Sequence, residues 1–426
     1  MILKSFSKEE KSWVYYDFAS SVFSTMMAAT VFPVFFMGMA GGNDTPGSFW
    51  WATGIIVARL IVGFLAPFIG ALIDYEGYKK RIFALSLAFG GFFTAFTAFV
   101  GAWELLLIGY ILANIGFSIC SQIHETFLPD VTTKERMDRV SLMGYAFNYG
   151  GGSTIPLTAS LLLIFFGHHI GLDNTAAVRV SIIITASWWM IFSVPFLRNV
   201  THKHGKKNPE KGFFLETLRN IWATAKKIRA NPSVFWFLIA YFFFIDGVGT
   251  IINMATSFGS EIGLSGNEMI GAIFVAQLVA VPFSLLFGRL AKRFGSINMI
   301  VVAILIYFVI SIVAFIMGFG LEQGYFGVET AQLLFWILAG LVGTSQGGIQ
   351  GLSRSTYGKL VPPEHSGDFF GFFEIFGRFS SIMGPALYAI TLTITGRPSV
   401  SMLSVIILFG VGLVLLLSVK NHIGRI

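Results

Sequence analysis

Two aspartates stand inside long apolar runs, where a carboxylate needs a chemical reason. Asp17 lies in "WVYYDFASSVFSTMMAATVFPVFF" at residues 13–36, and Asp246 lies in "FWFLIAYFFFIDGVGTIINMATSF" at residues 235–258. An ionisable side chain in hydrocarbon is costly, and such residues usually mark an ion or proton pathway. We therefore predict that Asp17 and Asp246 bind a proton or another cation. A role in helix packing or gating is the alternative.

Small polar residues follow one face of the same runs and of two further runs. Residues at i, i+4 and i+7 share a face of an α-helix. Unpaired polar groups that face lipid cost several kcal/mol each, so these faces should line a cavity. For any single serine, a hydrogen bond to its own helix is the alternative. The candidate cavity residues are Ser21, Ser24, Asn114, Asn253, Gln346 and Gln350 on these faces, together with Asn148 in the run near residues 140–165.

Charged residues occur in other apolar runs as well. Glu374 and Arg378 have the i, i+4 spacing of a pair within one helix. Alternatively, Arg378 holds a substrate carboxylate or phosphate, which its planar guanidinium suits. Arg59 has no partner nearby in its own run. It either pairs across a helix bundle, with Asp17 or Glu125, or binds an anion.

A second proton-binding group is predicted at the end of the run near residues 104–127. His124 and Glu125 are neighbours there, and histidine titrates near neutral pH. We predict that this pair relays protons to or from the cavity.

Patterns typical of other chemistry are missing from the sequence. The stretch "GLSRSTYGKL" lacks the spacing of a nucleotide-binding loop, and no run groups a nucleophile with a base. His168 and His169 have too few possible ligands around them to predict a metal site. We expect no catalytic residues, no metal and no cofactor, and hence a protein that is not an enzyme.

The composition indicates what positions these residues. Of 426 residues, 55% are hydrophobic and 12% charged, and 46 are phenylalanine, which is typical of a protein that crosses the membrane many times. We predict an all-α membrane protein with twelve transmembrane helices in two six-helix bundles. The spans are expected at 12–40, 48–73, 82–101, 104–127, 140–165, 176–197, 232–259, 267–288, 297–318, 330–352, 368–395 and 398–420.

The net charge of +7 comes mainly from the loops that lie inside the cell when the N-terminus is inside. Most of the 29 Lys and Arg residues fall there, whereas Arg179 and Arg397 fall outside. Excess positive charge marks the cytoplasmic side. We predict a multi-pass protein of the cell (inner) membrane, a monomer, with both termini in the cytoplasm. The basic balance does not indicate nucleic-acid binding.

The chain is predicted to have three parts. Residues 1–198 and 232–426 form the two bundles, and 199–231 form a cytoplasmic linker. The linker stretch "FFLETLRNIWATAKKIRANP" separates apolar from basic residues at helical spacing, which is typical of a helix that lies on the membrane surface.

The two bundles read as copies of one unit, about 218–230 residues apart. "GALIDYEGYKK" at 70–80 follows the second span, and "GRLAKRFGSIN" at 288–298 follows the eighth. The copies share Gly288 with Gly70, but Lys292 stands where the first copy has an acid, so we expect no equivalent latch there. The candidate gating residues are Gly70, Asp74, Gly77, Lys79, Lys80, Gly288 and Arg293.

"GALIDYEGYKK" resembles the loop signature of the major facilitator superfamily, Gly-x-x-x-Asp-(Arg/Lys)-x-Gly-x-(Arg/Lys)-(Arg/Lys). It departs from that signature at Tyr75, where a base is usual. The resemblance implies that Asp74 is a gating residue that contacts a neighbouring helix in the outward-open state. It also implies two parallel repeats that are related by an axis along the membrane normal.

A narrower resemblance comes from "GGIQGLSRSTYGKLVPPEHSGDFFGFFEIFGRFSSIMGP" at 347–385, together with "YDFASS" in the first span. Both are similar to the Atg22-like family, which includes the UMF1 group. "IHETFLPD" at 123–130 departs from the family pattern, so the resemblance assigns no role to His124 and Glu125. It implies a transporter, with amino-acid efflux as the activity associated with the vacuolar members.

These features together predict a secondary transporter that works by alternating access. We expect proton coupling and a small polar or zwitterionic solute such as an amino acid or peptide, and the family resemblance implies that the solute moves outward. The many phenylalanines favour two alternatives, a lipid or drug exporter and a flippase. A non-transporting membrane scaffold or sensor is the alternative of another class.

Overall fold

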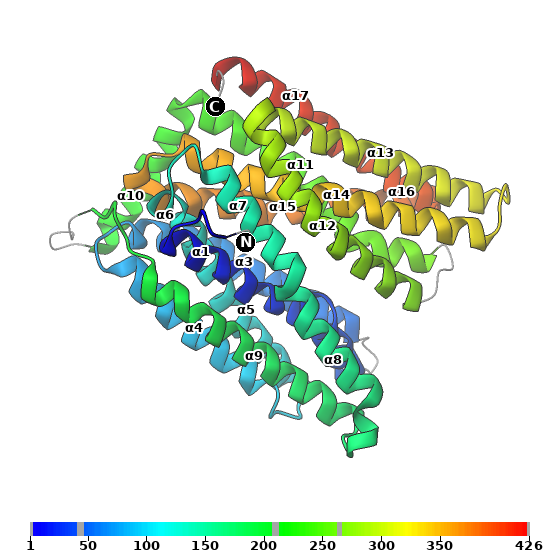
Figure 1. Ribbon diagram of the computed structural model, residues 1–426. Helices are drawn as coiled ribbons and strands as arrows, with labels where there is room; N and C mark the ends of the chain where they lie inside the picture. Colours follow the sequence, from blue (N-terminus) through cyan, green and yellow to red (C-terminus); the bar gives the residue numbers. More distant parts are fainter. Residues whose placement is uncertain (1–2, 41–46, 207–212, 262–265, 424–426) are drawn as a thin grey trace. The chain divides into compact units, whose positions relative to one another are not determined.

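The computed structural model describes residues 3–40, 47–206, 213–261 and 266–423, and these are almost entirely helical (Figure 1). The first half contains α1 (Lys8–Phe23), α2 (Val31–Ala40), α3 (Gly47–Ile73), α4 (Tyr78–Phe96), α5 (Trp103–Thr126), α6 (Leu128–Val131), α7 (Met137–Phe147), α8 (Thr154–Phe166) and α9 (Asn174–Asn199). The second half contains α10 (Phe213–Ala230), α11 (Pro232–Glu261), α12 (Gly266–Phe294), α13 (Ser296–Glu322), α14 (Val328–Leu360), α15 (Ser366–Thr395), α16 (Pro398–Ser404) and α17 (Ile406–Ile423).

Eleven helical segments of the described chain are long and apolar enough to cross a membrane. They coincide with eleven of the twelve predicted spans. The remaining predicted span, 82–101, corresponds to α4, which has 19 residues and begins with charged residues in its first turn. The all-helical fold class predicted from the sequence is confirmed.

Local sequence explains how several helices begin. Ser7 and Glu10 form a capping box at the start of α1, in which the Glu10 N–H donates to Ser7 Oγ at 3.0 Å and the Ser7 N–H donates to Glu10 Oε2 at 2.8 Å. Gly77 precedes α4 with φ +81°, a backbone conformation that favours glycine. This turn reverses the chain between α3 and α4.

Two predicted spans are interrupted by a π-helical turn. Residues Ser24–Ala29 separate α1 from α2, and Asn148–Ser153 separate α7 from α8. The second turn contains three consecutive glycines, and a Cβ at Gly152 would overlap the Ser21 hydroxyl and the Phe18 carbonyl of α1. Glycine at this position therefore lets α1 and the π-helical turn approach closely.

The described chain divides into two compact units that are not continuous in sequence. Unit 1 contains residues 1–133, 147–223 and 362–372, and unit 2 contains 134–146, 224–361 and 373–426. Helices α7 and α15 thus each contribute residues to both units. The predicted division at residues 198 and 231 concerns the order along the chain and stays a prediction.

Unit 1 has an aromatic and small-residue core. Phe23 stacks on Phe117 with ring centroids 4.4 Å apart, and Trp189 is fully buried beside both rings. A Cβ at Gly116 would lie 2.6 Å from the Cα of Gly90, so α4 and α5 touch through their backbones. Such close contacts between small residues are typical of helices that pack inside a membrane.

Unit 2 follows the same packing rule. A Cβ at Gly343 of α14 would lie 2.5 Å from the Ala276 carbonyl oxygen of α12. Tyr307 of α13 stacks on Phe409 of α17 with ring centroids 5.3 Å apart. The outer faces of both units expose large apolar side chains, for example Phe99 at 75% and Ile394 at 78%, which suits contact with lipid.

Candidate functional site

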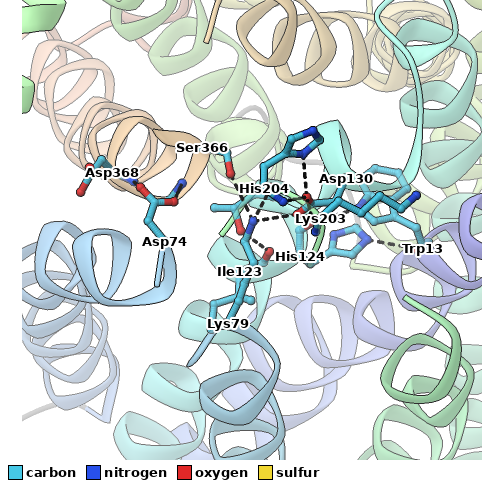
Figure 2. A network of polar contacts seen from close by, with 12 residues as sticks. Trp13, Asp74, Lys79, Ile123, His124, Asp130, Lys203, His204, Ser366 and Asp368 are labelled. Atoms are coloured by element: carbon cyan, nitrogen blue, oxygen red, sulfur yellow. Dashed lines mark hydrogen bonds and ion pairs between the residues drawn. The ribbon is translucent and has the colours of Figure 1, made fainter. Parts of the chain in front are cut away.

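Asp17 lies on α1, buried to 7% exposure inside unit 1. Its Oδ1 lies 3.9 Å from Nδ1 of His124 on α5. His124 is held firmly, because its ring stacks on Trp13 at 4.2 Å and its Nε2 lies 3.0 Å from the Trp13 carbonyl oxygen. The Trp13 indole N–H donates to the His124 carbonyl oxygen at 2.8 Å (Figure 2). The structure therefore brings together Asp17 and His124, two of the predicted proton-binding residues.

The predicted polar faces of unit 1 show both kinds of contact that the sequence left open. The Ser21 hydroxyl donates to the Phe18 carbonyl oxygen at 3.1 Å, so it bonds to its own helix, and Ser24 is exposed. On α5, Asn114 links the hydroxyls of Tyr110 and Ser118 at 3.4 Å each. This row of three polar side chains follows the i, i+4 spacing read from the sequence.

The other polar residues of unit 1 contact neighbouring helices or turns. Asn148 begins the second π-helical turn, where its Oδ1 accepts a hydrogen bond from Ser153 at 3.4 Å. Arg59 on α3 and Glu125 on α5 are half-buried. Gln122, which follows the polar row of α5, donates to the Ala66 carbonyl oxygen of α3 at 2.7 Å.

Asp246 lies on α11 and is fully buried inside unit 2. Its Oδ2 accepts the backbone N–H of Gly384 on α15 at 2.9 Å. Its Oδ1 has no hydrogen-bond partner among the described residues. Gly384 must be glycine for this contact, because a Cβ there would overlap the Thr250 hydroxyl and lie 2.9 Å from Oδ1. Buried polar atoms are usually satisfied, so this oxygen is suited to a bound proton, cation or solute group.

Helix α15 also contains an ion pair between Arg378 and Glu374. Arg378 Nε and Glu374 Oε2 lie 2.8 Å apart, with 20% and 13% of the side chains exposed. The i, i+4 pairing predicted from the sequence is thus formed, and it keeps two opposite charges together inside the span.

The remaining predicted polar residues of unit 2 are dispersed. The Gln346 amide donates to the Ala276 carbonyl oxygen at 3.4 Å, Gln350 is half-buried, and Asn253 is exposed. Arg354, one turn beyond Gln350, is buried against α7, where Nε donates to Ser141 Oγ at 2.9 Å.

The predicted gating loop between α3 and α4 contacts the start of α15. Asp74 is 1% exposed, and its carboxylate accepts the N–H groups of Gly367 at 2.6 Å and Asp368 at 3.1 Å. These are free donors of a first helical turn, which favour a negative charge. A Cβ at Gly70 would overlap the Gly367 carbonyl oxygen, so α3 and α15 approach closely here.

Lys79 is the centre of a second buried network (Figure 2). It is fully buried, and its ammonium group donates to the Thr126 carbonyl oxygen at 3.0 Å, to Asp130 Oδ2 at 3.0 Å and to Ser366 Oγ at 3.1 Å. The ammonium also lies 4.7 Å from the centroid of the Phe127 ring. Lys80, the next residue of the signature, is only half-buried.

The electrostatics differ between the two loop carboxylates. Burial and the neighbouring Asp368 raise the pKa of Asp74 from 3.8 to about 6, against the pull of Lys206 and Lys79. Burial also opposes the charge of Asp130, but Lys79 outweighs it and lowers the pKa of that carboxyl. Asp130 is therefore an anion at neutral pH. Asp74, by contrast, has a pKa only slightly below neutral pH.

A related network occurs in unit 2. Lys359, at the end of α14, donates to Asp138 Oδ2 at 2.6 Å and to Ser296 Oγ at 2.8 Å. The Ser355 hydroxyl donates to the other oxygen, Asp138 Oδ1, at 2.6 Å. Lysine, aspartate and serine thus occur in both networks, with the lysine on α4 in unit 1 and on α14 in unit 2.

The second copy of the signature has different contacts from the first. Lys292 and Arg293 are exposed, and Arg293 Cζ lies 5.3 Å from the ring of the adjacent Phe294. A Cβ at Gly288 would lie 3.3 Å from Leu142 of α7. Sequence reasoning missed the roles of Asp138 and Lys359, as it missed those of Asp130 and Asp368, because their partners lie 51 to 221 residues away along the chain.

Asp74 and two side chains near it could together ligate a metal ion by type and distance. One ligand atom each of Asp74, His365 and Asp368 lie within 4.8 Å of one another. However, the Lys206 ammonium lies 3.3 Å from Asp74 Oδ2 and 2.9 Å from Asp368 Oδ2. The positive charge between the two carboxylates therefore comes from the protein itself.

The fold is shared with solved transporters of the major facilitator superfamily. The chain is similar to a bacterial homologue of the iron transporter ferroportin in its outward-facing state, with 15% identity, a TM-score of 0.69 and 97% and 99% of the two chains covered. It is also similar to FucP in the outward conformation, with 12% identity, a TM-score of 0.69 and the same coverage. These proteins have twelve helices in two bundles.

The sequence comparisons narrow the family. The chain is 41% identical to the uncharacterized MFS-type transporter YxiO of Bacillus subtilis, over 99% of this chain and 97% of that protein. It is 25% identical to autophagy-related protein 22 of Botryotinia fuckeliana over 66% of this chain, and spans 50% of that protein. Residues 41–426 match the family model described as "Vacuole effluxer Atg22 like". The chain therefore belongs to the Atg22-like family of major facilitator transporters.

Proposed function

We propose that this transporter exports a small zwitterionic solute and couples the movement to protons. The observation that carries the coupling is the buried Asp246 carboxylate, with one oxygen on the Gly384 N–H and the other without a partner among the described residues. An acid in this state can hold a proton in one conformation and lose it when solvent reaches it from the other side. Asp17 with His124, 3.9 Å apart in unit 1, is the corresponding site of the first repeat.

The proposed cargo class follows from the charged pair of α15. Arg378 and Glu374 present a guanidinium and a carboxylate 2.8 Å apart in a half-buried position. An amino acid carries the complementary carboxylate and ammonium at similar spacing. Arg378 would bind the carboxylate of the solute, and Glu374 its ammonium, so the solute replaces the pair within the helix. The family description as an effluxer supports the outward direction.

The proposed orientation places both termini, the Asp74 loop and the Lys79 network on the cytoplasmic side of the cell membrane. The support is the charge pattern, because most of the Lys and Arg residues fall on loops of this side.

The test is transport by purified protein in proteoliposomes, with radiolabelled L-amino acids supplied one at a time. We expect accumulation driven by an imposed pH gradient. D246N should keep exchange of labelled for unlabelled solute but lose the pH-driven accumulation, because asparagine accepts the Gly384 N–H and carries no proton. The matched control is D173N, since Asp173 is an exposed cap of α9 and asparagine caps equally well.

The outcomes separate the parts of the proposal. Accumulation by D246N equal to wild type would exclude Asp246 as the coupling group. Absence of movement of every amino acid by the wild-type protein would contradict the cargo class.

A further inference from the structure

The segment that follows α9 is attached along one end of unit 1. We call residues 200–206 the strap. The Thr201 hydroxyl donates to Glu9 Oε1 at 2.8 Å, and the N–H groups of Lys203 and His204 both donate to Asp130 Oδ1, at 3.0 and 3.2 Å. Figure 2 shows His204 and Lys203 beside the Lys79–Asp130 network. The strap therefore contacts α1 and the segment after α5 at once.

The far end of the strap reaches the gating loop. The Lys206 N–H donates to the Asp74 carbonyl oxygen at 2.8 Å, and the Glu76 N–H donates to the Lys206 carbonyl oxygen at 2.9 Å. These two bonds form a parallel β-bridge between Lys206 and Tyr75. The backbone thus places Lys206 directly beside the position where the loop signature departs from its usual base.

The Lys206 side chain completes this arrangement. Its ammonium bonds both Asp74 and Asp368, two carboxylates that are 1% and 4% exposed. Two buried like charges so close together repel, and a cation between them removes the repulsion. Lys79 cannot take the place of Lys206 between the two carboxylates, because its ammonium already donates to Asp130, Thr126 and Ser366.

We infer that Lys206 is a positioning residue of the gate, which supplies from the linker the positive charge that the loop lacks at Tyr75. The inference rests on the proposed alternating-access function. In the conformation described here, Lys206 fastens the strap to Asp74 and to the first turn of α15. The strap must detach before that turn can leave the loop, so the linker takes part in the conformational change.

The ionisation of the lysine supports this role. Burial opposes the charge of Lys206, but the Asp74 and Asp368 carboxylates outweigh burial and raise its pKa. The ammonium therefore stays charged throughout the physiological pH range.

The test is amide hydrogen exchange of the purified full-length protein in detergent, which requires no substrate. K206Q should speed exchange in residues 200–206 and 366–372 by about tenfold to a hundredfold, the effect of losing charge-assisted hydrogen bonds. K206R should keep slow exchange. The matched control is K203Q, because Lys203 lies on the same strap but pairs with Glu9 and is 46% exposed; it should leave residues 366–372 unchanged.

Moving the positive charge from residue 206 to residue 75 tests whether Lys206 acts through its charge or only through its packing. In the double variant Y75R/K206Q, the arginine stands next to Asp74 and should restore slow exchange at residues 366–372. Unchanged exchange in K206Q, or the same rise in K203Q as in K206Q, would overturn the inference. A double variant that exchanges as fast as K206Q would show that the charge does not act from that position. Amide exchange is measured without any solute, so this test gives a result even if the transport assay shows no movement of amino acids.

Discussion

Asp74 and His202, two titratable residues at the strap, respond to acid with opposite signs. His202 is half-buried, and neither of its ring nitrogens has a hydrogen-bond partner among the described residues. Burial and the nearby Lys79 lower its pKa from 6.5 to about 4, in spite of Asp130. Asp74 has its pKa raised from 3.8 to about 6. Relative to the unfolded chain, the folded protein thus favours a neutral imidazole at His202 and a protonated carboxyl at Asp74.

The signs follow from linkage between protonation and structure. The stabilisation from Asp74 is fully present below pH 3.8 and is lost as the pH rises through about 6. The stabilisation from His202 is present above pH 6.5 and is lost as the pH falls through about 4. Between pH 6.5 and pH 4 the two contributions oppose each other, so together they should change the free energy of unfolding only a little.

Single variants should reveal each slope. D74N leaves only the histidine contribution, so the free energy of unfolding should fall on acidification from pH 6.5 to 4. H202Q leaves only the aspartate contribution, so the free energy of unfolding should rise over the same interval. The melting temperature of each purified variant, compared with that of the wild type at each pH, measures both slopes. Parallel slopes in D74N and H202Q would contradict this assignment.

At the scale of elements, glycines decide where helices of one unit can touch. Gly70 on α3 faces the backbone of Gly367, and a Cβ at Gly371 would lie 3.0 Å from the Ala66 carbonyl oxygen. The contact between α3 and the first turns of α15 therefore depends on hydrogen in place of a side chain. This contact also presents the N–H groups of Gly367 and Asp368 to Asp74.

We expect G70A to weaken this contact. Its methyl group would overlap the Gly367 carbonyl oxygen, an overpacking that costs about 1–3 kcal/mol, although alanine in a helix gains about 1 kcal/mol over glycine. The melting temperature of the purified protein should fall, and exchange at residues 366–372 should rise.

The matched control is G38A on α2, where an added Cβ meets nothing within 4 Å. G38A has the helix gain without the overlap, so its melting temperature should not fall. A melting temperature of G70A equal to that of G38A would show that α3 and α15 can separate without loss.

At the scale of the whole chain, two related networks fix the ends of helices in the two units. Lys79, Asp130 and Ser366 form one, and Asp138, Lys359 and Ser296 form the other. Each position of one network lies about one repeat length from a position of the other, with the residue types exchanged. Helices α7 and α15, which contribute residues to both units, each begin at such a network. The two repeats therefore share the three positions of the network but differ in which residue type stands at each position.

The proposed membrane orientation has a direct test with cysteine labelling. The one native cysteine, Cys120, is buried and should not react with a membrane-impermeant maleimide. Thr133, which follows α6, and Thr175, in the first turn of α9, are both exposed and are predicted to lie on opposite sides of the membrane. T175C should be labelled in intact cells, whereas T133C should be labelled only after the cells are permeabilised. Labelling of T133C in intact cells would reverse the topology.

The sequence by itself determined the helices, their transmembrane length and the burial of Asp17 and Asp246. These properties follow from hydropathy and hydrogen bonding within a run of about 20 residues, so neighbours along the chain suffice to predict them. The pairing of Glu374 with Arg378 was also predictable, because the two residues are one helical turn apart.

Only the tertiary structure decided which distant charges meet. Nothing local to Lys206 indicates that its ammonium lies between Asp74 and Asp368, 132 and 162 residues away. The same holds for Lys79 with Asp130 and for Lys359 with Asp138, because nothing in the sequence around either lysine indicates its partner. The physical reason is that an ion pair depends on where folded helices bring their ends together, whereas a span depends on a local sum of apolar side chains.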